Sequence, residues 1–271
     1  MAAPIIELKD LAKMFPVHGR TLTVFENLSC GIEAGSFVSI VGPSGCGKST
    51  LLKLVCGLDS PSAGTVLFQN RPVSGPARGM IYVFQHYTRS ILPWRDVIGN
   101  VAFGLNATKK SLPPRQARDK CLEYIRLVGL EGYERYHPYQ LSGGMQQRVC
   151  IARALICEPA VLLMDEPFSA VDAMTRAVLQ ELILKIRATI PVTILFVTHD
   201  VDEAVFLSSR VIALGPAPAA IRDDVAIDLP QPRDQIVTRE DGRFIATRQR
   251  LFASIFLQEK REQARPAVPQ D

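Results

Sequence analysis

Short hydrophobic runs alternate along the chain with longer segments in which apolar residues recur at helical spacing. The runs are rich in β-branched and leucine residues, a composition that is typical of buried strands. Five of them are predicted as strands: Ser36–Val41, Met80–Phe84, Val161–Met164, Val192–Val197 and Val211–Leu214. Because helix-length segments separate these strands, the pattern predicts an α/β fold built on a largely parallel sheet.

The beginning of the chain and a long middle segment depart from this alternation. Ile5–Leu8, Thr21–Phe25 and Gly64–Phe68 are predicted to be strands of an antiparallel β edge. From about residue 88 to residue 158 the strand pattern disappears, and helical patterns such as Gln116–Val128 replace it. The middle segment is therefore predicted to be an α-helical subdomain inserted between two strands of the sheet.

Beyond Gly215 the chain is rich in proline and alanine and then carries charges of both signs. Its apolar residues recur at helical spacing: Phe244, Leu251, Phe252, Ile255 and Phe256. Such a stripe is typical of a helix that packs on its own domain, and we favour this over a membrane or regulatory helix. The uninterrupted apolar runs are far shorter than the ~20 residues that span a bilayer. The N-terminus shows no basic segment followed by a long apolar stretch, so no secretory signal is predicted.

Composition narrows the choice of partner and compartment. The 271 residues include 31 basic and 27 acidic ones, a formal net charge of +4. Without a clustered basic stripe this imbalance is too small to indicate a nucleic-acid partner, so none is expected. The cysteines form no CxxC pair and have no histidines at zinc spacing, which favours reduced, mostly buried thiols. They are Cys30, Cys46, Cys56, Cys121, Cys150 and Cys157.

A glycine-rich segment follows the first buried strand and directly precedes a predicted helix. It fits the pattern GxxxxGK followed by Ser. With the next residue it comprises Gly42, Pro43, Ser44, Gly45, Cys46, Gly47, Lys48, Ser49 and Thr50. Glycines let the backbone wrap so closely that successive N–H groups form an anion nest, and the helix N-terminus adds a favourable dipole. Lys48 supplies a positive charge for the β- and γ-phosphates of a nucleotide, and the Ser49 hydroxyl is suited to bind Mg²⁺.

Two adjacent acids follow the strand at Val161–Met164. Carboxylates in this position are costly unless they meet a cation or hydrogen-bond donors. Asp165 is therefore a candidate to hold Mg²⁺ through water, and Glu166 is a candidate general base facing the γ-phosphate. An acidic turn before Pro167 is the alternative interpretation, which the glycine-rich segment makes less attractive.

A third motif lies about twenty residues before the acidic pair, at the start of another predicted helix. Its residues are Leu141, Ser142, Gly143, Gly144 and Met145. Here the chain resembles the ABC ATPase family, whose signature is LSGGQ-like, with Met145 in place of the usual glutamine. In that family the signature completes the nucleotide site of the opposing subunit. The resemblance therefore implies a head-to-tail homodimer that holds two ATP at its interface.

The resemblance covers roughly residues 5 to 215 and assigns further positions. Gln85 matches the glutamine that reaches Mg²⁺ and the attacking water, and His199 matches the switch histidine that contacts the γ-phosphate. Val171 replaces the usual leucine in the loop that touches the partner subunit. The residues of this loop are Ser169, Ala170, Val171 and Asp172.

The resemblance also implies a domain organisation. Residues 1–271 would form a single ABC ATPase domain, with a nucleotide-binding core at 1–87 and 159–215, a helical subdomain at 88–158 and a C-terminal extension at 216–271. Phe15 lies where an aromatic side chain of the family stacks on adenine, and Phe25 is a rival for this role.

Leu92–Arg95 and Asn100–Leu105 look like the nitrate, sulfonate and taurine group of bacterial importers. In this family the surface formed by Gln85–Asp96 receives a short helix of the membrane subunit. Trp94 is the single tryptophan, and either a docking anchor or a core position would suit it.

The resemblance to these importers implies a transport-coupled ATPase, a translocase, that powers uptake of a small anionic or organic solute. Its implied cofactors are ATP and Mg²⁺. Its implied place is peripheral, on the cytoplasmic face of the inner (plasma) membrane. Permease subunits would be its direct partners, and a periplasmic or lipid-anchored solute-binding protein an indirect one.

Two other functions stay open at this point. A soluble ABC protein of DNA repair or translation would use the same ATPase as a clamp, but such proteins usually carry two cassettes or a long coiled coil. An ATPase of an exporter or lipid machine is the third possibility. The cargo is selected by other subunits, so the sequence carries almost no information about it.

Overall fold

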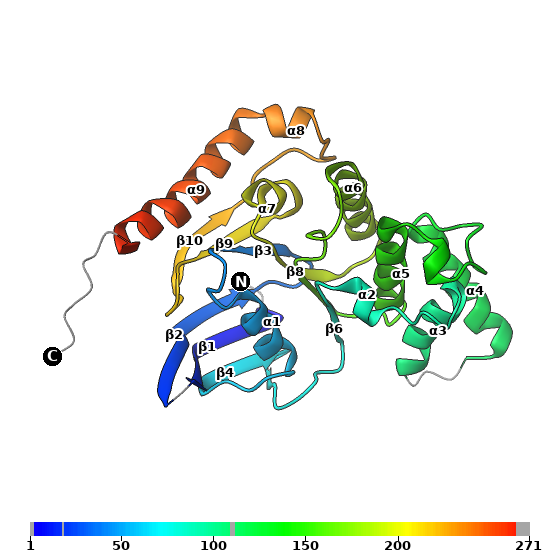
Figure 1. Cartoon of the computed structure of the whole chain (residues 1–271), viewed down its shortest axis with the longest axis horizontal. Helices are drawn as coiled ribbons and strands as arrows, with labels where there is room; N and C mark the ends of the chain where they lie inside the picture. The colour runs from blue at the N-terminus through cyan, green and yellow to red at the C-terminus, as the bar shows by residue number, and fades with distance from the viewer. Residues whose placement is uncertain (1–2, 18, 109–111, 264–271) are drawn as a thin grey trace. The chain divides into compact units, whose positions relative to one another are not determined.

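The computed structural model describes residues 3–17, 19–108 and 112–263 (Figure 1). The chain divides into two compact units. The first holds the described residues up to Pro76 and from Phe196 onward, and the second holds Ala77–Leu195. The chain passes from the second unit back to the first within strand β8 (Thr193–Val197).

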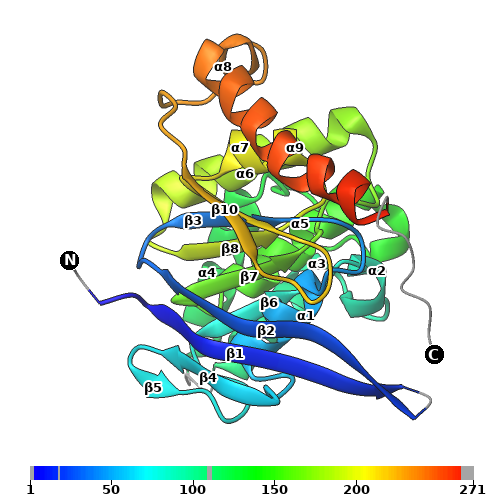
Figure 2. The ribbon, with the colours of Figure 1, turned by 90° about the vertical axis from the view of Figure 1, so that its left-hand side faces the viewer.

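An antiparallel sheet forms one part of the first unit (Figure 2). In spatial order its strands are β2 (Arg20–Ile32), β1 (Ile6–Val17), β4 (Ala63–Phe68) and β5 (Arg71–Pro72). The predicted antiparallel edge is thus confirmed, but β1 and β2 are much longer than their hydrophobic runs. The register of β1 shifts between Leu8 and Leu11, beside Asp10 with its φ of 48°. Such a shift breaks the period-two alternation of buried positions, so the hydrophobic pattern marks only part of the strand.

Parallel strands form the other part of the first unit. β3 (Phe37–Val41) is buried along its whole length and pairs in parallel with β9 (Arg210–Leu214), and both match predicted strands. β10 (Ile221–Ala226) pairs antiparallel with β9. The sequence does not predict β10, because Arg222, Asp223 and Asp224 interrupt any hydrophobic run on this half-exposed strand.

In the second unit, β6 (Met80–Val83) and β7 (Val161–Asp165) pair in parallel, as predicted. Between them the described residues from 88 to 158 contain helices and no strand. The helices from β6 onward are α2 (Tyr87–Ser90), α3 (Val97–Ala107), α4 (Pro114–Leu127), η1 (Pro138–Gln140) and α5 (Gly143–Leu155). α3, α4 and α5 pack on one another, which confirms the inserted α-helical subdomain. α6 (Ala173–Thr189) follows β7.

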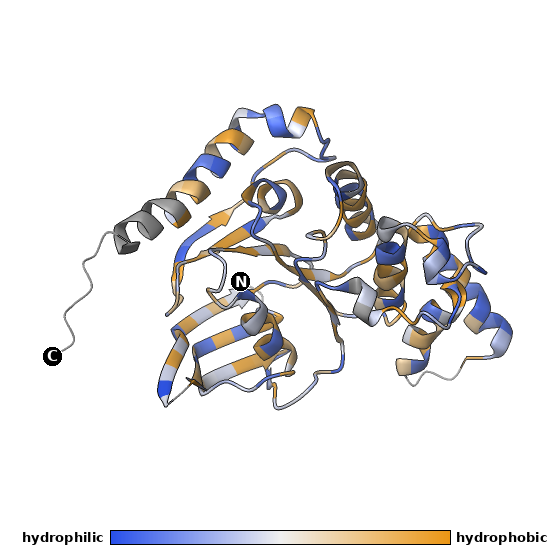
Figure 3. Ribbon diagram, viewed as in Figure 1, coloured by the Kyte–Doolittle hydropathy of each residue, from blue (hydrophilic) through white to orange (hydrophobic). Residues whose placement is uncertain are grey.

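The chain after β10 leads into a long helix that packs on its own unit, as its spacing predicts. α9 (Gly242–Gln263) lies against α7 (Val201–Leu207), β9 and β10, and the short α8 (Val237–Glu240) precedes it. Hydrophobic and hydrophilic residues are interspersed along the coloured part of α9 (Figure 3), and Phe244 and Leu251 are 0% exposed. The side chain of Phe256 lies outside the described part of the helix. Within the described ranges, no helix combines the length and the apolar character needed to cross a membrane.

The cysteines are free thiols, as predicted. Four of them are buried and the other two, Cys30 and Cys157, are half-buried. Burial raises the pKa of each thiol, that of Cys30 to about 11. The thiols are therefore neutral near pH 7, where a nucleophilic thiolate would need a lowered pKa.

Candidate functional site

The glycine-rich segment forms a tight loop between β3 and α1 (Lys48–Cys56). Lys48 begins the helix, and its side chain folds back so that Nζ donates to the carbonyl oxygens of Gly42, at 2.9 Å, and Pro43, at 2.8 Å. The residue is only 6% exposed. The loop therefore holds a buried ammonium group at a helix N-terminus, where backbone dipoles also favour an anion.

Gly47 shows why the loop needs a glycine at its last position. It precedes α1 with a φ of 102°, a backbone conformation that other residues rarely adopt. A β-carbon there would also lie 2.3 Å from Cγ1 of Val24 and 2.7 Å from Cζ of Phe25. These β2 side chains thus support the loop from behind, a role that the sequence does not reveal. Because Phe25 is 0% exposed, it offers no ring face to a base, which leaves Phe15 as the candidate for adenine stacking.

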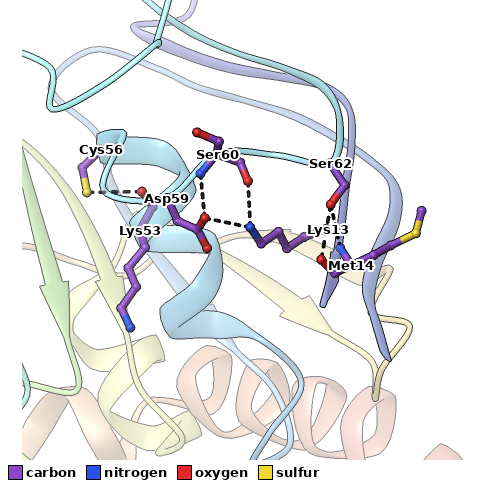
Figure 4. Close-up of polar contacts among 7 residues, drawn as sticks. All are labelled: Lys13, Met14, Lys53, Cys56, Asp59, Ser60 and Ser62. Atoms are coloured by element: carbon purple, nitrogen blue, oxygen red, sulfur yellow. Dashed lines mark hydrogen bonds and ion pairs between the residues drawn. The ribbon is translucent and has the colours of Figure 1, made fainter. Parts of the chain in front are cut away.

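A buried lysine ties the strand that carries Phe15 to the loop that follows α1 (Figure 4). Lys13 is 8% exposed, and its Nζ donates to the Asp59 carboxylate at 2.7 Å and to the carbonyl oxygen of Ser60 at 2.8 Å. The hydrogen bond from Lys13 lowers the pKa of Asp59. The same Nζ lies 4.6 Å from the centre of the half-buried Phe15 ring. Phe15 is thereby positioned relative to the helix that starts with Lys48.

In the second unit, parallel pairing of β6 with β7 brings the predicted acids close to Gln85. Asp165 ends β7, is 6% exposed and accepts a hydrogen bond of 2.7 Å from the Tyr82 hydroxyl. Nε2 of Gln85 donates to Oε2 of Glu166 at 3.3 Å. Glu166 has a φ of 41°, a strained value for a non-glycine residue. Strain of this kind concentrates at functional sites, and the catalytic role of Glu166 stays a prediction.

The oxygen groups predicted to bind Mg²⁺ fit that ion chemically. Mg²⁺ prefers hard oxygen ligands and usually takes one or two carboxylates together with substrate phosphates. Asp165 provides a buried carboxylate, and Ser49 and Gln85 provide a hydroxyl and an amide oxygen. In the described part of the chain, no group of three or more His, Cys, Asp or Glu side chains is placed to hold a metal by itself. Each of these donors is thus of a kind that suits Mg²⁺.

The signature motif leads into α5 and contributes the N-cap and the first residues of this helix. Ser142 caps the helix, its hydroxyl accepting a 3.3 Å hydrogen bond from the Met145 N–H. Gly144 lies so close to α6 that a β-carbon on it would come 2.4 Å from Cγ2 of Thr175. Gln147, 1% exposed, donates from its side chain to the carbonyl oxygen of Pro167. These contacts connect the signature helix to the segment that follows Glu166. The sequence does not predict this connection.

The predicted dimer loop is ordered by hydrogen bonds of its own. The Ser169 hydroxyl donates to the carbonyl oxygen of Glu166 at 2.9 Å. Asp172 caps α6, accepting from the Thr175 N–H at 3.0 Å and from its hydroxyl at 2.6 Å. These hydrogen bonds from Thr175 lower the pKa of Asp172. Asp172 therefore has a structural role, helix capping, within its own chain.

His199 lies exposed in the short loop between β8 and α7. Thr198 before it donates from its hydroxyl to the buried Glu203 carboxylate at 2.7 Å. Asp200 after it caps α7 by accepting from the Glu203 N–H at 3.1 Å. Both neighbours of the histidine are thus held by the first turn of α7.

The predicted residues fall into two sets by unit. Lys48, Ser49, Phe15 and His199 belong to the first unit. Gln85, Asp165, Glu166, the signature and the dimer loop belong to the second.

A buried asparagine organises the loop that contains Trp94. Asn100 is 0% exposed, and its side-chain amide donates to the carbonyl oxygens of Leu92, Arg95 and Asp96 at 3.1 Å each. It also accepts from the Leu92 N–H at 2.9 Å. Trp94 is 72% exposed, so it is a surface residue and not a core residue.

A cavity of about 320 Å³ lies beside the same segment, between β6, α3 and α5. Phe84 and Phe103 contribute aromatic surface to it, and each is 48% exposed. The guanidinium of Arg153 donates to the carbonyl oxygen of Ser90 at 2.7 Å and to its hydroxyl at 3.1 Å. The cavity is therefore mostly apolar, and the guanidinium of Arg153, held by Ser90, lies at its wall.

The family model for the ABC transporter family matches residues 25–169. An uncharacterised ABC transporter ATP-binding protein of Methanocaldococcus jannaschii is 46% identical over 85% of this chain and 85% of its own length. An aliphatic sulfonates import ATP-binding protein of Bacillus cereus is 41% identical over 85% of this chain and 89% of its own length. A taurine import ATP-binding protein of Yersinia pestis is 43% identical over 86% of this chain and 91% of its own length.

Solved structures resemble the chain over most of its length. A dimeric ATP-binding cassette in a post-hydrolysis state, bound to ADP and Pi, is 30% identical, with a TM-score of 0.72 over 82% of this chain and 99% of that chain. A part of an ABC transporter complex from Clostridium perfringens is 23% identical, with a TM-score of 0.74 over 97% of this chain and 99% of that chain. The second likeness concerns the fold alone.

Gly144→Ala should lower the free energy of unfolding by about 1–3 kcal/mol, because the added methyl group overpacks against Thr175. Thr175→Ser removes the methyl group in conflict and keeps the hydroxyl that donates to Asp172. The double variant should therefore recover most of the loss in a urea titration followed by circular dichroism. Equal losses in the single Gly144→Ala variant and the double variant would contradict the contact.

Proposed function

The chain belongs to the ABC transporter family and is an ABC-type ATPase, and from that premise we propose that it powers the import of a small anionic or organic solute through a separate permease. The observation that carries the ATPase role is the buried Lys48 ammonium held at the N-terminus of α1. The names of the relatives from Bacillus cereus and Yersinia pestis support import of a sulfonate or taurine, and nitrate is the other solute in the class we favour.

ATP binds in this proposal through its phosphates and its base. Nζ of Lys48 exchanges the two loop carbonyls for oxygens of the β- and γ-phosphates, which are stronger partners because they are charged. The remaining loop residues, Gly42 to Thr50, enclose the phosphates with backbone N–H groups. The Phe15 ring stacks on adenine with one face while Lys13 lies against the ring, a contact that fixes its orientation.

Hydrolysis uses mainly positioning and charge stabilisation. Glu166 accepts the proton of the attacking water, and Gln85, already hydrogen-bonded to Glu166, orients that water. His199 donates to a γ-phosphate oxygen and stabilises the charge that develops there. Bound Mg²⁺ would neutralise charge on the β- and γ-phosphates, with Ser49, Asp165 and Gln85 as its oxygen ligands.

The active form in this proposal is a homodimer. The N-terminus of α5, with Leu141 to Met145, serves the ATP of the opposing subunit, for which exposed helix N–H groups are suited. The dimer loop, Ser169–Asp172, contacts the partner. Support comes from the solved cassette that is dimeric and bound to ADP and Pi, and that is similar to this chain over most of its length.

The permease docks on the segment Gln85–Asp96 in this proposal. Asn100 holds the loop so that Trp94 is exposed, and the neighbouring cavity offers apolar surface for a short helix of the permease. An exposed tryptophan next to an apolar hollow is a favourable anchor. The chain then works on the cytoplasmic face of the plasma membrane as a peripheral subunit, and a solute-binding protein outside delivers the cargo. No nucleic acid takes part.

Lys48→Ala should weaken ATP binding about 10- to 100-fold, since a hydrogen-bonded contact to a charged group is worth about 1.5–3 kcal/mol. Isothermal titration calorimetry with ATP measures the loss of affinity. Lys53→Ala is the matched control, because Lys53 lies exposed on the same helix. An unchanged affinity of Lys48→Ala for ATP would contradict the proposal that the loop binds the phosphates.

Glu166→Gln should retain ATP affinity and lose at least about 100-fold in kcat, because the amide cannot accept the proton of the attacking water. Phosphate release under saturating ATP measures kcat. Glu181→Gln, on the exposed face of α6, is the control and should hydrolyse ATP at the rate of the unaltered chain. Normal turnover in Glu166→Gln would show that another group is the base.

Trp94→Ala should weaken binding to the permease by about 2 kcal/mol, or roughly 30-fold, if the tryptophan is a docking anchor. Binding is measured with a detergent-solubilised permease that co-purifies with the unaltered chain, and circular dichroism verifies folding. Phe252→Ala is the aromatic control, since Phe252 is 39% exposed on α9. If Trp94→Ala and Phe252→Ala bind the permease with equal affinity, Trp94 is not a docking anchor.

A further inference from the structure

Helix α7 is held at its C-terminal end by a residue of the C-terminal extension. NH1 of Arg233 donates to the carbonyl oxygen of Val205 at 2.9 Å and to that of Phe206, and NH2 donates to that of Ser208 at 2.7 Å. The last carbonyls of a helix lack partners within the helix, and a cation is favourable there. Arg233 is 8% exposed, so these bonds also compensate for burying its charge.

Two further contacts from the extension reach the same helix. The guanidinium of Arg239 lies 4.9 Å from the centre of the buried Phe206 ring. NH1 of Arg248, on α9, lies 3.3 Å from the carboxylate of Asp202 in the first turn of α7. Both members of that pair are partly exposed, so it contributes little energy of its own. Arg233 is therefore the main polar attachment of α7 to the extension.

The opposite end of α7 carries the loop with His199. The Glu203 carboxylate and the Asp200 cap hold the residues on either side of the histidine. α7 has seven residues, which at about 1.5 Å per residue spans roughly 10 Å. A shift or tilt of so short a helix at its C-terminal end moves its first turn as well, and the loop with it.

We propose that Arg233 is a positioning residue for His199, and that the C-terminal extension thereby sets the rate of ATP hydrolysis through α7. This inference rests on the proposed role of His199 at the γ-phosphate. The extension makes no contact with ATP in this proposal. It acts by fixing the place of the imidazole, and a misplacement of about 1 Å in a catalytic group is enough to cost up to roughly 100-fold in rate.

Two substitutions separate this role from simple stabilisation. Arg233→Lys keeps the positive charge but replaces the planar fork with a single ammonium group, so it reaches fewer of the carbonyls. We expect kcat to fall about tenfold and the KM for ATP to change less than twofold. Arg233→Met removes the donors and should lower kcat further. If Arg233→Met is too unstable to assay, Arg233→Lys carries the test.

The deciding experiment compares Arg233→Lys in the unaltered chain and in His199→Ala. Hydrolysis of γ-labelled ATP by the full chain is followed for long enough to quantify the slow variants, and thermal unfolding is recorded for each. If Arg233 acts through the histidine, Arg233→Lys should have less than a twofold effect once His199 is alanine, because the two losses share one cause. Arg250→Gln is the matched control, since Arg250 on α9 pairs with Asp223 of β10 at 2.6 Å and should leave kcat unchanged.

The outcomes distinguish the positioning role of Arg233 from the proposed function on which it rests. Losses that multiply in the double variant, or a loss in Arg233→Lys that appears in KM and not in kcat, would overturn the positioning role and leave the proposed function intact. Normal hydrolysis by His199→Ala would overturn the role of His199 itself, and the positioning inference with it.

Discussion

The hydrogen bonds of the buried Lys48 ammonium are the interaction on which the glycine-rich loop between β3 and α1 depends. A charge at 6% exposure is stable only where hydrogen-bond acceptors surround it, and two carbonyls of its own loop provide them. The loop reaches that shape because Gly47 adopts a positive φ and lies against Val24 and Phe25 without a β-carbon between them. The antiparallel sheet therefore supports the glycine-rich loop directly, through Val24 and Phe25 of β2.

A related constraint shapes the second unit. Asp165 ends a fully buried strand, and its carboxylate is compensated by the Tyr82 hydroxyl from the neighbouring strand. Parallel pairing places the ends of β6 and β7 together, so Gln85 and Glu166 meet there as well. The contact of Gln147 with Pro167 then connects the signature helix to the segment after these acids. Groups that are distant in sequence thus become neighbours because buried polar atoms must find partners.

Local patterns predict most of the regular structure but miss elements whose stability is not local. Strands β3 and β9 were predictable because an uninterrupted apolar run suits a strand buried on both faces. Strand β10 was not, since Arg222, Asp223 and Asp224 place half of it at the surface, where pairing with β9 alone defines it. The long β1 was recognised only at its start because its register shifts break the alternation.

By itself the sequence determined the chemistry: a glycine-rich loop with Lys48, an acidic pair after a strand and a signature at a helix start are local patterns with fixed spacing. It left open which aromatic residues are buried, because burial depends on distant segments. Only the tertiary structure decided that Phe25 is core while Phe15 is half-exposed and that Trp94 is at the surface. Only the tertiary structure shows that Arg233 donates to the last carbonyls of α7 and to Ser208. A hydrogen bond between residues 25 to 28 positions apart produces no periodic pattern in the sequence.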